Sequence, residues 1–199
     1  MILKICGITN QEDATAAIHA GATAVGFNFY PRSPRYLAPQ AAAEIVVPAG
    51  VLRVGVFVNE QCHRVEEIAE TARLDVAQLH GDETPADYPT LPVWKAVRVS
   101  ESFDLANFAD DPAEALLLDG PAGEAFGGTG RTFDWRLARH SGRKIVLAGG
   151  LDSSNVAAAI ELVRPWGVDV CSRIESAPGK KDHKKMNEFL QAAMAAAHA

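Results

Sequence analysis

The sequence predicts an α/β protein, a closed (β/α)8 barrel that forms one domain over residues 1–199. Short apolar segments rich in β-branched residues alternate with helix-forming segments, and this alternation repeats eight times. Strands of this kind, separated by helices, form a parallel sheet covered by helices. Eight such units close into a barrel, although the chain is at the short end of the usual range. An open doubly wound sheet is the alternative, but open sheets usually carry fewer units.

Each expected strand is a short apolar run that ends at a polar or glycine-containing turn. The first run covers residues 2–6 and leads directly into Gly7, whereas the sixth, residues 115–119, ends on an aspartate. Alternation along the first run places Ile2, Lys4 and Cys6 on one face. The remaining strands are expected at residues 22–27, 52–57, 75–79, 93–98, 144–148 and 167–171.

Helix boundaries follow from capping residues and from glycine. Thr9 or Asn10 can cap the first helix, acidic residues follow, and Gly21 ends it. Helices are expected at residues 11–20, 40–47, 60–72, 83–88, 103–108, 134–139, 152–162 and 182–197. Two long loops remain, at residues 28–39 and 120–130, and the glycines of the second suggest a mobile lid.

Composition restricts the class of protein. The chain has 48% hydrophobic and 22% charged residues, which is ordinary for a globular domain. A net charge of −6 gives no sign of nucleic-acid or anionic-membrane binding. No apolar run reaches the ~20 residues of a membrane span. The three separated cysteines offer neither a zinc motif nor a disulfide framework, and we expect a cytoplasmic protein without a signal peptide, metal or cofactor.

Two side chains at strand ends are candidates for proton transfer, because the carboxyl ends of barrel strands converge on one mouth. Cys6 ends the first strand, and Asp119 ends the sixth. Cys6 can equally be a small buried thiol, and Asp119 can simply cap a turn. A carboxyl group that emerges from an apolar strand can also act as a general acid.

A phosphate site is expected at the loops that follow strands seven and eight. Gly149 and Gly150 follow the seventh strand, and Ser172 and Arg173 follow the eighth. Barrels often bind phosphate in these two loops through backbone amides and a short helix N-terminus. The glycine pair can alternatively form a tight turn only.

Three further polar residues are candidates for the wall of the pocket. Gln78 and His80 share a face at the end of the fourth strand, and Arg35 lies in the long loop after the second. Arg35 could pair bidentately with a carboxylate, or it could be a solvated surface cation. A lone histidine is usually structural, so His80 is not assigned as a base.

Several motifs resemble the phosphoribosylanthranilate isomerase family of tryptophan biosynthesis, and they fall in order along nearly the whole chain. They are residues 4–9 (KICGIT), 33–36 (SPRY), 78–83 (QLHGDE), 117–119 (LLD), 127–130 (GGTG), 132–135 (TFDW), 147–151 (LAGGL) and 178–182 (PGKKD). The resemblance implies a (β/α)8 barrel, an Amadori rearrangement of a small phosphorylated substrate, and no cofactor or metal. It does not indicate the oligomeric state.

The resemblance also implies roles for individual residues. Asp119 matches the general acid that protonates the furanose ring oxygen, and Cys6 matches the general base that takes the proton from C2′. Arg35 matches the residue near the anthranilate carboxylate, and the loops at Gly149–Gly150 and at Ser172–Arg173 match the phosphate site. Lys4, on the same strand face as Cys6, could help to lower the pKa of the thiol.

The segment after the eighth strand departs from the family pattern. The family usually has Ser-Ser-Gly, an apolar residue and Glu, whereas this chain has Cys171, Ser172, Arg173, Ile174 and Glu175. The missing glycine places a side chain near the phosphate, and it leaves open whether Arg173 binds through its side chain or its amide. Cys171 is interpreted as a packing residue.

Three other functions remain as alternatives. A bifunctional histidine- and tryptophan-pathway isomerase is expected to carry an aspartate in place of Cys6. An epimerase-like barrel would need inward-facing metal ligands, which the strand ends lack. A catalytically silent barrel that binds phosphorylated sugars would have no need for both Cys6 and Asp119.

Overall fold

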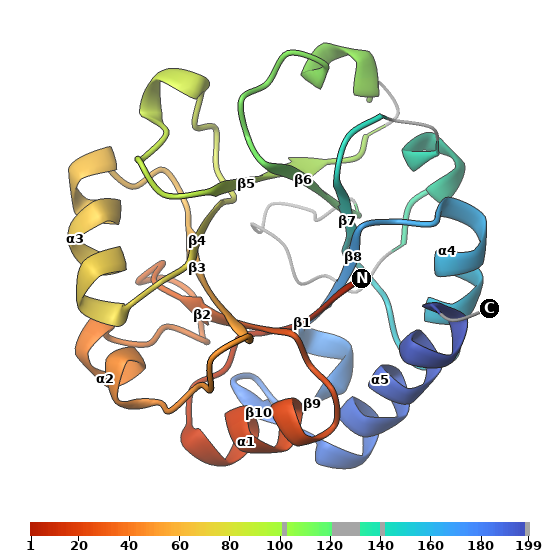
Figure 1. Cartoon of the computed structure of the whole chain (residues 1–199), viewed down its shortest axis with the longest axis horizontal. Helices are drawn as coiled ribbons and strands as arrows, with labels where there is room; N and C mark the ends of the chain where they lie inside the picture. The colour runs from red at the N-terminus through yellow and green to blue at the C-terminus, as the bar shows by residue number, and fades with distance from the viewer. Residues whose placement is uncertain (101–102, 121–131, 140–141, 198–199) are drawn as a thin grey trace.

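Eight parallel strands close into a barrel in chain order within the part of the chain that the computed structural model describes, residues 1–100, 103–120, 132–139 and 142–197. β1 pairs with β8 to complete the ring, and helices surround it (Figure 1). The predicted (β/α)8 barrel is therefore confirmed, and the open-sheet alternative is wrong. The barrel strands are β1 (Ile2–Cys6), β2 (Ala24–Asn28), β3 (Leu52–Phe57), β4 (Val76–Leu79), β5 (Val93–Arg98), β6 (Ala115–Asp119), β7 (Ile145–Leu147) and β8 (Gly167–Val170).

The helices outside the barrel are of unequal length. The α-helices are α1 (Gln11–His19), α2 (Pro39–Glu44), α3 (Cys62–Ala72), α4 (Val156–Val163) and α5 (His183–Ala197). The 3₁₀ helices are η1 (Pro85–Asp87), η2 (Leu105–Phe108), η3 (Trp135–Ala138) and η4 (Ser172–Ile174). The helices expected at residues 83–88, 103–108 and 134–139 are thus short 3₁₀ turns, because three or four residues cannot complete an α-helical segment.

Two local differences from the expected elements occur near the end of the chain. α4 begins at Val156, four residues later than expected, because Asp152 and Asn155 form a turn: the Asp152 N–H donates to Asn155 Oδ1 over 2.9 Å. The loop after η4 contains an unexpected antiparallel hairpin, β9 (Glu175–Ala177) and β10 (Lys180–Lys181). This hairpin lies beside α1 outside the barrel (Figure 1).

Alternation along the strands divides the core into two parts. Along β6, Ala115 and Leu117 belong to the cluster inside the barrel, and Leu116 and Leu118 belong to the cluster between barrel and helices. Asp119 continues the inward series, so its carboxyl group emerges at the barrel mouth. The interior below the mouth is filled by apolar side chains: Ala24, Val54, Val76, Trp94, Ala96, Ala115, Leu117, Val146 and Ala148.

Candidate active site

A cavity of about 450 Å³ opens at the carboxyl ends of the strands. Its volume is in the range of small-molecule sites. All nine residues that the sequence singled out line it: Cys6, Arg35, Gln78, His80, Asp119, Gly149, Gly150, Ser172 and Arg173. They converge because each lies at the carboxyl end of a parallel strand or in the loop after it, and the ends of such strands meet at one mouth.

Cys6 is buried at the end of β1 and is a free thiol. Its pKa is held well below the ordinary value, first by a hydrogen bond from Cys171 and then by the charges of Lys4 and Lys181, which together outweigh burial. A lowered pKa is what a thiol needs to act as a base near neutral pH, because the thiolate is the reactive form.

Lys4 lies inside the barrel, two residues before Cys6 on the same face of β1, and has no exposed surface. Its ammonium group contacts Asp169 Oδ1 at 2.8 Å. Burial alone would lower the pKa of Lys4, but Asp169 and Cys6 raise it above its ordinary value, so the side chain keeps its charge. Burial raises the pKa of Asp169 to about 7 even though Lys4 is its partner. A fixed positive charge therefore lies next to the Cys6 sulfur, as the shared strand face predicts.

Cys171 corrects one expectation from the sequence. It lines the cavity next to Cys6, and its sulfur lies 3.8 Å from Lys181 Nζ and 3.9 Å from Glu175 Oε1, so it is more than a packing residue. The parallel register explains the contact: Ile5 pairs with Val170, which brings the next residues of the two chains together at the rim. A sequence alone shows alternation along a strand but not the register between strands one and eight.

Asp119 lies next to His80 in the cavity wall. Asp119 Oδ2 lies 3.4 Å from His80 Nε2, and His80 Nδ1 lies 3.1 Å from Gln78 Nε2. The Gln78 amide can donate to Nδ1, whereas His80 Nε2 is buried without a hydrogen-bond partner among the described residues. The end of β4 thus places two polar side chains beside the carboxyl group at the end of β6.

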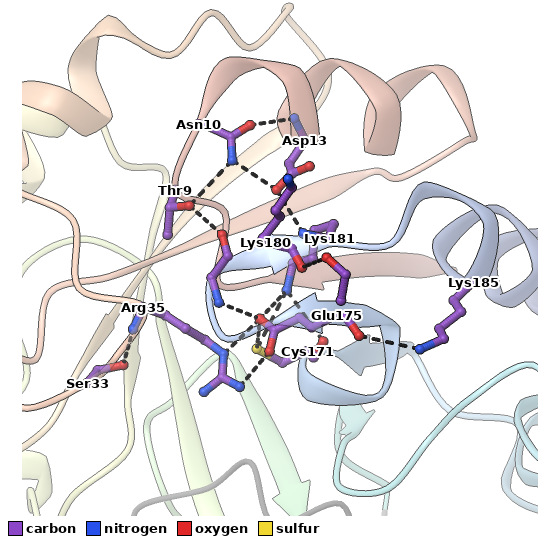
Figure 2. A network of polar contacts seen from close by, with 12 residues as sticks. Thr9, Asn10, Asp13, Ser33, Arg35, Cys171, Glu175, Lys180, Lys181 and Lys185 are labelled. Carbon is purple, nitrogen blue, oxygen red and sulfur yellow. Dashed lines mark hydrogen bonds and ion pairs between the residues drawn. The ribbon is translucent and has the colours of Figure 1, made fainter.

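Arg35 is neither a solvated surface cation nor unpaired. Its guanidinium group binds Glu175 bidentately, with Nε 2.8 Å from Oε1 and Nη2 2.6 Å from Oε2. Lys181, which is fully buried, contacts the same carboxylate at 3.0 Å (Figure 2). Although Glu175 is half-buried, these two cations lower its pKa, and it holds the loop after β2 against the β9–β10 hairpin.

The glycine pair after β7 has a conformation that other residues avoid. Gly149 and Gly150 have φ of 78° and 67°, which for L-residues with side chains is the unfavourable left-handed region. A methyl group at Gly149 would also lie 2.5 Å from Asp119 Oδ1. Beside them, after the neighbouring strand β8, Ser172 and Arg173 form the start of η4, and Arg173 Nε lies 4.0 Å from Asp152 Oδ2.

Sequence reasoning missed three residues that organise this site: Asp169, Glu175 and Lys181. Each had a signal, because Asp169 shares a strand face with Cys171, and the other two belong to quoted motifs. The expected lid glycines, Gly123, Gly127, Gly128 and Gly130, lie outside the described residues.

The described residues form neither a metal-ligand cluster nor a membrane-spanning helix. Among them, no group of three or more His, Cys, Asp and Glu side chains is arranged to hold a metal ion. Each helix in the same ranges is too short or too polar to cross a bilayer.

The chain forms a closed parallel barrel with a cavity at its mouth. The cavity is lined by a thiol of lowered pKa, a carboxyl group and a glycine pair, and this combination is typical of barrel enzymes that carry out acid–base chemistry on small molecules. Residues 3–192 match the family model described as N-(5′-phosphoribosyl)anthranilate (PRA) isomerase. The chain belongs to this family of aldose–ketose isomerases of tryptophan biosynthesis.

Individual relatives agree with this assignment. The N-(5′-phosphoribosyl)anthranilate isomerase of Solibacter usitatus is 67% identical over 197 residues, covering 98% of each chain. The crystal structure of phosphoribosyl anthranilate isomerase from Thermotoga maritima has a TM-score of 0.88 and 44% identity, covering 98% of this chain and 100% of that one. Another similar structure, with a TM-score of 0.85, 41% identity and coverage of 98% and 100%, is that of the isomerase in complex with reduced 1-(o-carboxyphenylamino)-1-deoxyribulose 5-phosphate.

Proposed function

We propose that the protein converts N-(5′-phosphoribosyl)anthranilate into 1-(2-carboxyphenylamino)-1-deoxyribulose 5-phosphate by general acid–base catalysis, with Asp119 as the acid and Cys6 as the base. The observation that carries the proposal is that a thiol of lowered pKa and a carboxyl group, on strands three positions apart around the ring, line the same cavity. Family membership supports the substrate, and the cavity geometry supports the division of roles.

The reaction follows from these two groups. Asp119 donates a proton to the furanose ring oxygen while the bond from that oxygen to C1′ breaks, and the nitrogen lone pair forms a Schiff base. The Cys6 thiolate then takes the proton from C2′, and the electrons of that C–H bond give an enolamine. Tautomerisation moves a proton to C1′ and yields the ketone. The acid and the base act on different atoms of one sugar, which is consistent with their different strands.

The polar rim supports the proposed binding roles. Gly149, Gly150, Ser172 and Arg173 are proposed to hold the phosphate, through backbone amides in the loops that barrels commonly use. Arg35 is proposed to lie near the anthranilate carboxylate. Its pair with Glu175 uses Nε and Nη2, and Nη1 carries two further N–H donors in the fixed plane of the guanidinium group. Gln78 and His80 are proposed to contact the substrate from the opposite wall.

Turnover, followed as the loss of substrate fluorescence, tests the proposal in the wild type, Cys6→Ala and Asp119→Asn. We expect an active wild type and a loss of about a hundredfold or more in kcat for each variant, which is the usual contribution of a positioned acid or base. Cys62→Ala is the matched control, because Cys62 is a free thiol at the start of α3 and is absent from the cavity lining.

Each contrary result has a defined meaning. An active Cys6→Ala variant would require another base, and an inactive wild type that still binds substrate would favour a silent phosphate-sugar binding barrel. Comparable turnover of the histidine-pathway aminoaldose would favour the bifunctional isomerase.

A further inference from the structure

A second thiol, Cys171, lies against the proposed base and has no role in the reaction described above. Its position is fixed by the barrel: Lys4 pairs with Asp169 and Ile5 with Val170, so Cys6 and Cys171 follow as neighbours at the ends of adjacent strands. The direct Lys4–Asp169 contact shows that this face of both strands points inward. Adjacent strands lie ~4.8 Å apart, which suits a contact between two short side chains.

Two glycines leave the space that the sulfur atoms occupy. A methyl group at Gly26, on β2, would lie 2.9 Å from Cys6 Sγ, and one at Gly7 would lie 2.9 Å from Cys171 Sγ. Both distances are well below a carbon–sulfur van der Waals contact, so any side chain there would displace a thiol. The rim therefore accommodates two adjacent sulfurs between strands β1, β2 and β8.

The charges around the pair decide which sulfur carries the negative charge. Lys4, whose ammonium group is fully buried, lies beside Cys6: a methyl group at Gly26 would be 2.9 Å from Cys6 Sγ and 3.1 Å from Lys4 Nζ. Cys171 Sγ lies 3.8 Å from Lys181 Nζ but also 3.9 Å from Glu175 Oε1, and Lys181 is already paired with Glu175 (Figure 2). Lys4 and Lys181 each have a carboxylate partner, and the partner of Lys181 lies against Cys171, where a second negative charge is unfavourable. The pKa of Cys171 is raised by its hydrogen bond with Cys6 and by burial, which outweigh the nearby cations Lys181 and Arg35.

We infer that Cys171 is a positioning residue for Cys6: its S–H group, which also lies within reach of Glu175 Oε1, turns toward the Cys6 sulfur, donates a hydrogen bond to it and stabilises the thiolate form. An S–H group is a weak donor, but a bond to an ionised acceptor is stronger than one between neutral groups. Cys171 needs no contact with substrate for this function. The inference deepens the proposed function, since it matters for catalysis only if Cys6 is the base.

The groups that face Cys6 come from four segments. They are Lys4 on β1, Asp169 and Cys171 at β8, Lys181 on β10, and Arg35 in the loop after β2. Substituting Cys171 leaves each of these other charges in place, so a change in the titration of Cys6 reports on the donated hydrogen bond.

The test measures how the alkylation rate of Cys6 by iodoacetamide depends on pH, with peptide mass mapping to separate Cys6 from the other thiols. Wild type, Cys171→Ala and Cys171→Ser are compared, with Cys62→Ala as the matched control. We expect the inflection for Cys171→Ala to rise by about one pH unit, which lowers the alkylation rate below the inflection about tenfold. Cys171→Ser keeps a donor, so its inflection should stay within about half a unit of the wild type.

Two results would overturn the inference: an unchanged inflection in Cys171→Ala, or equal shifts in the alanine and serine variants, which would mean that only packing was lost. Circular dichroism verifies that each variant is folded, and the serine variant keeps the test valid if the alanine variant is not. The pH profile of kcat/KM, measured in parallel, tests the proposed function separately. A shifted alkylation profile with an unshifted kcat/KM profile would support the hydrogen bond and contradict Cys6 as the base.

Discussion

At the scale of single residues, the barrel mouth depends on a charge placed where charges are costly. Lys4 has no exposed surface, and an unpaired ammonium group in such a position would lose its proton rather than remain charged. Asp169 and Cys6, both acidic groups, keep it protonated. The lysine in turn lowers the pKa of Cys6, so the lysine and the thiol favour each other's charged forms, whereas the charge of Cys6 raises the pKa of Asp169.

Replacing Lys4 tests this dependence. Methionine has a similar length but no charge, so Lys4→Met should move the alkylation inflection of Cys6 to higher pH and slow alkylation at pH 6 severalfold or more. The control is Lys184→Met, because the Lys184 side chain is 85% exposed and belongs to α5. An alkylation profile identical to that of the wild type would show that Lys4 does not influence the thiol.

The individual site residues could be predicted from the sequence to the extent that they terminate strands. Cys6 and Asp119 were recognisable because an apolar run stops at each of them, and a barrel brings such ends together. The Cys6–Cys171 contact and the Arg35–Glu175 pair were not, because both join segments more than a hundred residues apart. Their proximity depends on the register between strands and on the β9–β10 hairpin, which the sequence pattern does not predict.

At the scale of elements, the first helix is joined to the last by one buried carboxylate. Asp13 on α1 accepts hydrogen bonds from the Asn10 side chain and from the Lys181 N–H, each over 2.9 Å, and its Oδ1 lies 2.8 Å from His183 Nε2. Burial alone would raise the pKa of Asp13, but these partners lower it below the ordinary value. The carboxylate therefore links α1, β10 and the start of α5.

Asp13→Asn should lower the free energy of unfolding by about 1–3 kcal/mol at pH 7, because buried donors lose a charged acceptor. A carboxyl group whose pKa is lowered on folding contributes stability above its unfolded pKa, ~3.9, and loses that contribution as the pH falls through the folded pKa. The difference between wild type and variant should therefore shrink from pH 7 to pH 3 in urea unfolding.

The control for this experiment is Glu12→Gln, an exposed acid in the same helical turn, with an expected change within about 0.5 kcal/mol. An equal loss in Asp13→Asn at both pH values would mean that the ionised form of Asp13 contributes nothing.

The order of the elements followed from the sequence, but several helix types and boundaries did not. The alternation of short apolar runs with capped segments is a local pattern, and all eight strands lie where it predicts. The 3₁₀ turns and the late start of α4 depend on side chains that bond to nearby backbone, such as Asp134, whose Oδ1 accepts from the Arg136 N–H. Such bonds compete with helix formation without changing the apolar pattern.

At the scale of the whole molecule, the site rests on the packed interior of the barrel. Leu117, with no exposed surface, lies two residues before Asp119 on the inward face of β6. Below it, Trp94 packs edge-on against Trp166, with ring centroids 5.4 Å apart. These packed side chains hold the strand ends in place, and the strand ends set the distance between the proposed acid and the proposed base.

Leu117→Ala should lower the free energy of unfolding by about 2–5 kcal/mol, because it removes buried methyl groups and leaves a cavity. The measurement is denaturant unfolding, and Leu162→Ala on α4, at a leucine that is 37% exposed, is the control with a much smaller expected loss. A loss in Leu117→Ala no greater than in the control would show that the interior tolerates the gap.

The filled interior also determines how molecules pass through the enzyme. Side chains occupy the described barrel from its amino end up to the cavity, so no passage leads through it from that side. A product molecule has to depart through the mouth by which its precursor arrived, and the next precursor has to wait outside. Product release must therefore precede substrate binding, and a compound that binds at the rim blocks both entry and exit without contacting the acid or the base.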